Sequence, residues 1–154
     1  MKHVVELDID VAQAPLAELY ANPALSPQWM DDIARYEPLQ GTPGSPGSTY
    51  RLVPKSGSLV FVATVVSRDL PNEVVLNLDS PSVTVSVVGR LIPLSESRTR
   101  LVSEETFRFR GMVRRLVGVM ARPAIARAHR RHMEAFKAFA EAQAASLKRG
   151  LTTR

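Results

Sequence analysis

The sequence of 154 residues contains no cysteine, and this absence excludes several kinds of chemistry. Without cysteine there is no disulfide, no thiolate nucleophile and no metal site built from Cys ligands. No apolar run approaches the roughly 20 residues that a membrane-spanning helix needs. The first ten residues, MKHVVELDID, lack the apolar stretch of a signal peptide. We therefore expect a cytoplasmic protein.

Signatures of common enzymes and of nucleotide sites are also missing. There is no GxSxG nucleophile motif and no HExxH metal motif. The glycine-rich stretch GTPGSPGSTYRL at 41–52 leads into a strand-like segment, whereas a phosphate-binding loop leads into a helix. We interpret it as a stiffened hairpin loop at the rim of a cavity, and not as a nucleotide site or an interdomain linker. No cofactor is predicted.

Composition and charge describe an ordinary folded domain with a basic end. Hydrophobic residues make up 45%, charged residues 23% and aromatic residues only 6% of the chain, and the length suits a single domain over 1–154. The net charge is +5, but from Arg108 to the end there are 12 Lys or Arg and 2 acids. The rest of the chain has 8 bases and 13 acids. A basic region of this kind attracts anionic partners or forms a solvated helix face.

Hydrophobic periodicity predicts a strand, two short helices, a run of strands and a long final helix. The short helices lie within AQAPLAELYANP and ALSPQWMDDI, and the final helix covers about 111–148 with a kink or a split near Ala121, caused by Pro123. Between the later strands the connectors are rich in turn residues and too short for crossover helices. Strands are predicted at 3–9, 33–39, 49–53, 59–67, 73–79, 83–93 and 99–109.

This order predicts an α+β fold in which a curved antiparallel sheet of about seven strands wraps around the C-terminal helix. A sheet with one apolar face must cover that face, and only the final helix is long enough to do so. The two short helices after the first strand close one end.

The order of elements resembles the helix-grip fold of the START-like (SRPBCC) superfamily, particularly its polyketide cyclase/dehydrase branch. The resemblance covers about residues 2–148 and rests on the first strand, ALSPQWMDDI, GTPGSPGSTYRL, the hairpins up to ETFRFRG and the helix AHRRHMEAFKAFAEAQ. It implies a cavity for a hydrophobic ligand. Members of this superfamily range from lipid or hormone carriers to aromatic cyclases, without an invariant catalytic set to transfer.

Strand phase and helix spacing predict which side chains line a ligand cavity between the sheet and the helix. The alternative, which stays open here, is that these residues pack a solid core. Trp29 is expected near the mouth. The predicted lining residues are Trp29, Tyr50, Leu52, Phe61, Leu76, Leu78, Val85, Val87, Ser103, Glu105, Phe107, Phe109, Met112, Leu116 and Met120.

Ser103 and Glu105 are the most informative polar residues, because they share a strand face with Leu101 and Phe107. A carboxyl group on the concave face of a sheet needs a partner or stays protonated. Glu105, with Ser103 and Tyr50 assisting, is therefore a candidate for acid–base chemistry or ligand orientation. A local bulge that turns Glu105 outward, or a pair with a nearby arginine, are the alternatives.

Histidine and arginine clusters on the final helix give weaker signals. His129 and His132 share a helix face, but arginines lie between them and no third ligand is evident, so no metal site is predicted. Acids expected on the outer face of the sheet (Glu6, Asp8, Asp10 and Glu104) can compensate the basic helix. Without interleaved aromatic residues a nucleic-acid partner is disfavoured, and contact with an anionic membrane is slightly favoured over it. The basic set is Arg114, Arg115, Arg122, Arg127, Arg130 and Arg131.

The sequence therefore predicts a protein that binds a hydrophobic or aromatic small molecule. If the protein is an enzyme, the family resemblance implies cyclisation or dehydration of a polyketide-like chain. A non-catalytic carrier or sensor, or an interaction module that uses the basic helix, remain alternatives. A homodimer also stays open.

Overall fold

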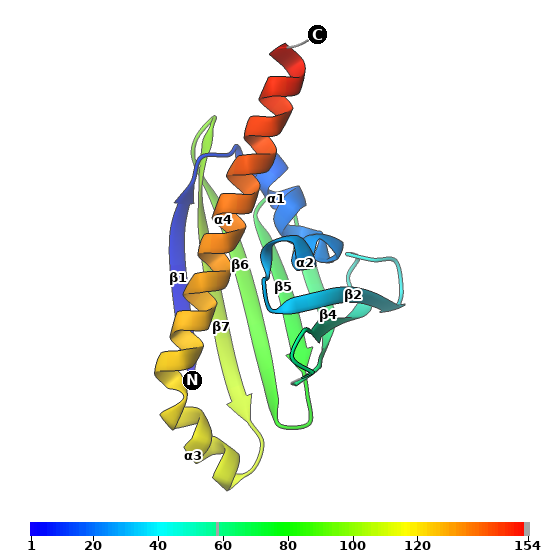
Figure 1. The fold of residues 1–154 in the computed structure, drawn as a ribbon, viewed down its shortest axis with the longest axis vertical. Coiled ribbons are helices and arrows are strands. Elements are labelled where there is room, and N and C mark those ends of the chain that lie inside the picture. Colours follow the sequence, from blue (N-terminus) through cyan, green and yellow to red (C-terminus); the bar gives the residue numbers. More distant parts are fainter. Residues whose placement is uncertain (58, 153–154) are drawn as a thin grey trace.

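The fold is built around one sheet of seven antiparallel strands (Figure 1). The structure is a computed structural model and describes residues 1–57 and 59–152. In space the strands follow the order β1-β7-β6-β5-β4-β3-β2, so the fold class and the antiparallel pairing predicted from the sequence are confirmed. The strands are β1 (Lys2–Ile9), β2 (Ile33–Gln40), β3 (Thr49–Pro54), β4 (Phe61–Asp69), β5 (Glu73–Asp79), β6 (Val83–Ser95) and β7 (Arg98–Phe109).

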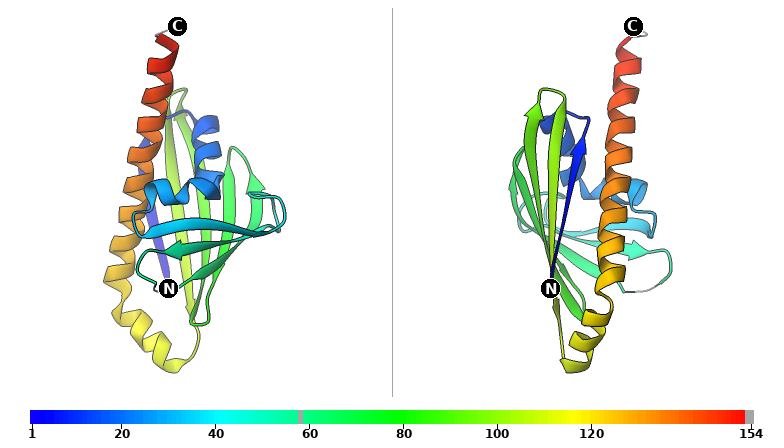
Figure 2. Two further views of the ribbon diagram at one scale, coloured as in Figure 1. Left: turned by 45° about the vertical axis from the view of Figure 1, so that its right-hand side comes forward. Right: turned by 90° about the vertical axis from the view of Figure 1, so that its left-hand side faces the viewer.

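Helices lie at one end of the sheet and along one of its faces. The helix α1 (Gln13–Ala21), the short 3-10 turn η1 (Pro23–Leu25) and α2 (Ser26–Trp29) follow β1. Asn22 caps η1, because its side-chain oxygen accepts a hydrogen bond of 3.2 Å from the Ala24 N–H. The long helix α4 (Arg122–Thr152) runs along the curled sheet, and its last turns extend beyond the strands (Figure 2). In the described part of the chain, no helix is long and apolar enough to cross a membrane.

A break near Ala121 divides the final helical segment, as Pro123 predicts. The helix α3 (Met112–Met120) ends there, and the Ala121 N–H donates to the Val117 carbonyl at 2.9 Å. Pro123 lies in the first turn of α4, where a backbone N–H has no helical acceptor and its loss costs nothing. As a result α3 lies at the end of the sheet and not along its face (Figure 1).

The main core forms where α4 meets β1, β7 and α1. Phe136 is completely buried there, and the rings of Tyr20 and Trp29 pack edge-to-face against it at centroid distances of 5.3 and 5.2 Å. Burying a side chain of this size contributes about 2–3 kcal/mol. Met133 and Ala140 continue the same buried row along α4.

A second, smaller cluster lies on the other side of the sheet's concave face. It consists of Tyr50, Ala63 and Val65 on β3 and β4, with Tyr36 and Leu52 packed beside it. The two clusters are separate, so the interior is filled at both sides of the sheet and not in the middle.

The outer face of the sheet carries ion pairs between neighbouring strands. Asp8 accepts from Arg100 at 2.8 Å, and Glu104 lies 3.0 Å from the Lys2 ammonium. Hydrogen bonding to Arg100 lowers the pKa of Asp8. Bases of the sheet itself therefore pair with Asp8 and Glu104, while Lys137 of α4 also lowers the pKa of Asp8. Compensation of the basic helix by these acids stays a prediction.

Gly89 in the middle of β6 is required by the packing of Tyr20. A Cβ atom at this position would lie 2.2 Å from Tyr20 Cε1. We predict that Gly89→Ala lowers the free energy of unfolding by roughly 1–3 kcal/mol through overpacking, as measured by urea denaturation. Gly150→Ala is the control, because a Cβ there meets no atom within 4 Å and this variant should be as stable as the wild type or slightly more so. Equal stability of the two variants would contradict the assignment.

Candidate functional site

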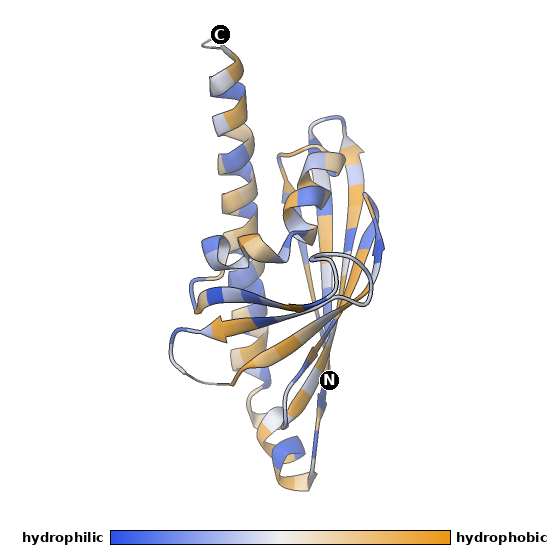
Figure 3. Ribbon diagram, turned by 90° about the vertical axis from the view of Figure 1, so that its right-hand side faces the viewer, coloured by the Kyte–Doolittle hydropathy of each residue, from blue (hydrophilic) through white to orange (hydrophobic). Residues whose placement is uncertain are grey.

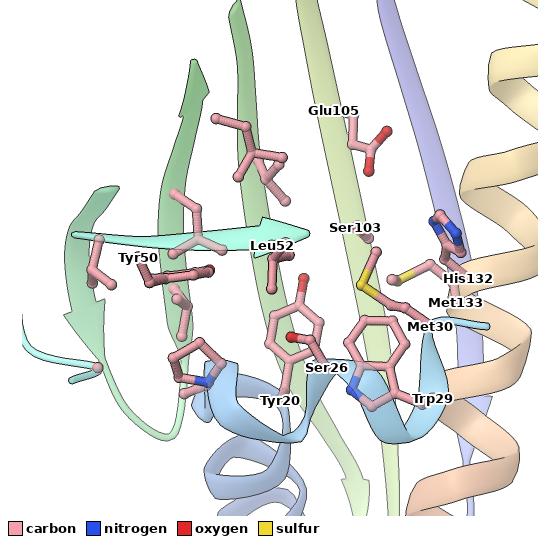
Figure 4. A pocket seen from close by; sticks show the side chains of 18 residues that line it. Tyr20, Ser26, Trp29, Met30, Tyr50, Leu52, Ser103, Glu105, His132 and Met133 are labelled. Carbon is pink, nitrogen blue, oxygen red and sulfur yellow. The ribbon is translucent and has the colours of Figure 1, made fainter. Parts of the chain in front are cut away.

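Two adjoining hollows between the sheet, α4 and the short helices form the candidate site, and Figure 4 shows the residues that line the smaller one. The hollow under α1 and α2 has a volume of about 100 Å³, and the hollow nearer to the start of α4 has a volume of about 320 Å³. The two hollows adjoin, because five residues border both. The shared residues are Met30, Leu52, Leu78, Glu105 and His132.

The structure brings eleven of the fifteen predicted lining residues to these hollows. For the ten that lie on strands, the place at the cavity follows from strand phase, and Trp29 reaches it from α2. The role of all eleven in binding stays a prediction. The loop between β2 and β3 reaches the cavity through Gly44, which agrees with the rim predicted from the glycine-rich stretch. The eleven residues are Trp29, Tyr50, Leu52, Phe61, Leu76, Leu78, Val85, Val87, Ser103, Glu105 and Phe107.

Four predicted lining residues lie elsewhere, three of them on α3. Met112, Leu116 and Met120 are 85%, 64% and 76% exposed and border neither hollow. Their assignment rests on their spacing of four residues in the predicted helix at 111–148, with its kink or split near Ala121. The break at that residue ends the helical register, so α3 turns a different side toward the sheet. Phe109, at the end of β7, packs beside Gly118 of α3 instead of facing the cavity.

A hydrogen-bonded chain of polar side chains leads from the cavity to the surface. Ser103 Oγ lies 2.9 Å from His129 Nε2, and His129 Nδ1 lies 2.8 Å from His3 Nδ1. Burial lowers the pKa of His129 to about 4, and the charges of His3, His132 and Arg130 act in the same direction. His129 is therefore neutral at pH 7, and one of its ring nitrogens donates while the other accepts. His3 borders an open groove at the surface, which gives the chain an outer end.

Glu105 borders both hollows from the middle of β7, with its side chain only 20% exposed. Burial raises the pKa of this carboxyl to about 7. Its Oε1 lies 3.7 Å from His129 Nε2, but an ion pair would raise the pKa of the histidine and lower that of the acid. Both pKa values move the opposite way, so the two groups do not form an ion pair. At neutral pH His129 is neutral and Glu105 is close to half-protonated.

Neither alternative placement of Glu105 is found. The pairing of β7 is regular at this residue, which lies opposite Val87 on β6 and His3 on β1. Among the described residues no arginine or lysine forms an ion pair with it. Figure 4 shows Glu105 and Ser103 on the same strand, with the rings of Tyr20 and Trp29 approaching from the short helices.

Three ring side chains add polar atoms to the smaller hollow. Burial raises the pKa of Tyr20 to about 12, although a hydrogen bond with Ser103 partly offsets this shift. Burial also raises the pKa of Tyr50. The indole N–H of Trp29 is buried and has no hydrogen-bond partner among the described residues. An unpaired buried donor costs about 1–3 kcal/mol, which an acceptor on a ligand can recover.

Sequence reasoning missed Tyr20 and did not place His129 in the cavity wall. For His129 the signal is helical spacing, because it lies on the same side of α4 as Met133, Phe136 and Ala140, all of them buried. For Tyr20 the signal was the isolated Gly89 inside a strand, because such a glycine often marks a close approach of another group.

Asp31, Asp32 and His132 form a cluster at the edge of the cavity. One ligand atom from each lies within 4.8 Å of the others, and His132 Nε2 lies 3.0 Å from Asp32 Oδ1. His129 directs its two nitrogens to Ser103 and His3, so the two histidines do not form the pair considered from the sequence. Exposed acids such as Asp31 commonly lie this close without an ion, and the cluster alone assigns no metal.

Comparison with solved structures establishes the fold. A START superfamily protein from Mycobacterium smegmatis superposes with a TM-score of 0.62 and 17% identity, over 84% of this chain and 94% of that one. The chain has the START-like helix-grip fold. No family model matches the sequence, and no curated protein matches it.

Two further structures share this START-like fold. The protein TTHA0849 from Thermus thermophilus gives a TM-score of 0.77 at 11% identity, over 93% of this chain and 99% of that one. The ZhuI aromatase/cyclase from Streptomyces sp. R1128 gives 0.64 at 16% identity, over 88% and 94%. At these identities the likeness concerns the fold alone.

Glu105 and His129 should contribute to the pH dependence of stability with opposite signs. The pKa of Glu105 rises from 4.5 to about 7 on folding, so its contribution to stability is lost as the pH rises through this window. The pKa of His129 falls from 6.5 to about 4, so its contribution is lost as the pH falls through that window. In the wild type the two contributions nearly cancel.

Replacing one group should therefore expose the contribution of the other. Relative to the wild type, Glu105→Gln should gain roughly 3 kcal/mol in its free energy of unfolding as the pH rises from 4.5 to 7. His129→Gln should lose a similar amount between pH 4 and 6.5. Urea denaturation at a series of pH values measures both. Profiles that run parallel to that of the wild type would show that neither pKa is shifted.

Proposed function

We propose that the protein binds a hydrophobic or aromatic small molecule in the cavity, with a carbonyl or hydroxyl group of the ligand at Glu105. One observation carries the proposal: a buried carboxyl group lies where two otherwise mainly apolar hollows join. Side chains such as Leu52, Leu78 and Phe107 provide the apolar wall. A cavity of this composition favours an apolar body with few polar groups.

Polar atoms at two sides of the smaller hollow support a defined orientation of the ligand. A protonated Glu105 donates to a carbonyl oxygen, and an ionised Glu105 accepts from a hydroxyl group. Trp29 offers an N–H that has no acceptor among the described residues. A ligand with two separated oxygen atoms can use both groups, while its apolar part extends toward the larger hollow beside Phe61 and Phe107.

A second candidate function is acid–base catalysis by Glu105, of the type that cyclises or dehydrates a polyketide-like chain. A pKa of about 7 is suited to both removing and returning a proton at neutral pH. The carboxylate would take a proton from a CH₂ group between two carbonyls, and the resulting enolate carbon would attack a second carbonyl of the same chain. The new alkoxide would take the proton back from Glu105, and loss of one water molecule would complete the dehydration.

The polar chain behind Glu105 favours this chemistry over a purely passive carrier. Ser103, His129 and His3 form a continuous path from the cavity to a surface groove, along which a proton can be exchanged with solvent. A carrier of uniformly apolar ligands has no need for such a path. The aromatase/cyclase among the solved structures supports the same class of substrate, at the level of fold.

Filling the cavity should abolish ligand uptake. Leu78 borders both hollows, so Leu78→Trp should weaken binding of the neutral aromatic probe 1-aminoanthracene at least tenfold, as measured by fluorescence titration. Ile92→Trp is the control, because Ile92 is 45% exposed and borders neither hollow. Leu116→Trp should not close the cavity, since Leu116 lies outside it. Unchanged probe binding in a folded Leu78→Trp protein would reject the cavity as the binding site.

Acid–base use of Glu105 can be separated from binding by a conservative substitution. With a linear poly-β-ketone thioester as substrate, Glu105→Gln should lower kcat on the order of a hundredfold, the usual contribution of a general base. Binding of 1-aminoanthracene should stay within about threefold, because the amide keeps the shape of the side chain. If the wild type leaves the substrate unchanged while still binding the probe, the protein is a carrier and the second candidate is wrong.

A further inference from the structure

The helix α3 turns its apolar side to the solvent. Six of its nine residues are large apolar side chains that are each more than half exposed. At 100° per residue they fill an arc of about 160° on the helix surface. In Figure 3, α3 forms the end of the molecule opposite to the C-terminus, and hydrophobic residues cover much of it. The six residues are Met112, Val113, Leu116, Val117, Val119 and Met120.

The opposite side of α3 is the side that contacts the protein. Gly118 is the buried residue of this helix, and a Cβ there would lie 2.5 Å from Cε2 of the Phe109 ring. A surface helix normally packs its apolar stripe on the core and shows its polar side to water. The helix α3 contacts the rest of the protein through Gly118, and this contact leaves its apolar side exposed to water. Exposed apolar patches of this kind mark contact surfaces.

Arginines are frequent on α3 and in the segments that precede and follow it in the sequence. From Thr106 to Met133 the sequence holds eight arginines and no aspartate or glutamate. Arg110 pairs with Asp79, and Arg130 and Arg131 lie within 4.0 Å of an acid. The remaining five have no carboxylate partner in the described part of the chain. They are Arg108, Arg114, Arg115, Arg122 and Arg127.

The combination of an apolar arc with unpaired arginines indicates which kind of partner binds this surface. A second copy docked α3 against α3 would bring two arginine sets together, and like charges would repel. A nucleic acid would pair with the arginines but leave the apolar arc in water. An anionic bilayer satisfies both features, because its headgroups pair with arginines while its acyl boundary receives apolar side chains. We propose that α3 is an interfacial helix that docks the protein on an anionic membrane surface.

Docking through α3 would also bring the larger hollow close to the bilayer. Phe107 lines this hollow and stacks on Phe109 at a centroid distance of 6.2 Å, and Phe109 in turn packs beside Gly118. Ile125, in the first turn of α4, lines the same hollow. A hydrophobic ligand would then pass between membrane and cavity without crossing much water. This consequence rests on the proposed ligand binding, whereas the docking itself does not.

Vesicle co-sedimentation of the full chain tests the proposal. The protein should bind phosphatidylcholine vesicles that contain phosphatidylglycerol, and it should not bind vesicles of phosphatidylcholine alone. Met112→Asn with Met120→Asn should weaken binding at least tenfold, because both side chains lie in the exposed arc. Arg115→Gln with Arg122→Gln should weaken it roughly tenfold or more, as expected for about 1 kcal/mol per arginine near an anionic surface.

Matched controls separate the α3 surface from general apolarity and charge. Leu147→Asn with Leu151→Asn removes two exposed apolar residues from the far end of α4, and Lys55→Gln with Lys148→Gln removes two charges elsewhere. Both control proteins should bind anionic vesicles like the wild type. Circular dichroism should show all variants folded, and all should still take up 1-aminoanthracene in solution, so failure of docking is distinct from failure of the cavity.

Three results would overturn the proposal. The first is equal binding of neutral and anionic vesicles, or no binding of either. The second is loss of binding in the control variants to the same extent as in the α3 variants. The third is a dimer, seen by sedimentation velocity, that the α3 substitutions dissociate, together with no binding to vesicles. In that case a second copy of the chain would be the partner of α3.

Discussion

The contact between α4 and the sheet at Phe136 is the constraint on which the rest of the structure depends. Phe136 is fully buried between Tyr20 and Trp29, and it holds the helix close to β1, β7 and α1. The sheet curls away from this contact toward β4, β3 and β2 (Figure 2). Farther along that curl, side chains from sheet and helix no longer meet, and the small cluster around Tyr50 packs by itself. The cavity is the space that this geometry leaves open.

Polar groups lie on the cavity wall next to the packed core around Phe136. Ser103 and His129 satisfy each other, but Glu105 has only a distant neighbour at 3.7 Å and Trp29 has an unpaired N–H. Such groups lower the stability of an empty protein, since a buried polar atom without a partner costs free energy. Glu105 and Trp29 both border the smaller hollow. This is the arrangement expected when a ligand completes the hydrogen bonding.

Short-range sequence patterns predicted much of the fold and part of the candidate site. Strand alternation placed Ser103 and Glu105 on the inner face, because a side-chain period of two is preserved along a regular strand such as β7. The same kind of extrapolation was wrong for Met112, Leu116 and Met120. A helical register does not survive the break at Ala121, and no local pattern tells how far α3 rotates after it. The partners of His129 and Tyr20 depend on contacts between distant segments, which periodicity cannot supply.

The protonation of Glu105 tests the central claim, that a carboxyl group lies in an apolar cavity between the sheet and α4. The measurement is a ¹³C NMR titration of the Glu105 carboxyl carbon in the protein without added ligand. A midpoint near pH 7 is the predicted result, because burial raises the pKa of this group to about 7. A midpoint near 4.5, the ordinary value, would mean that water reaches the carboxyl freely and would contradict the account.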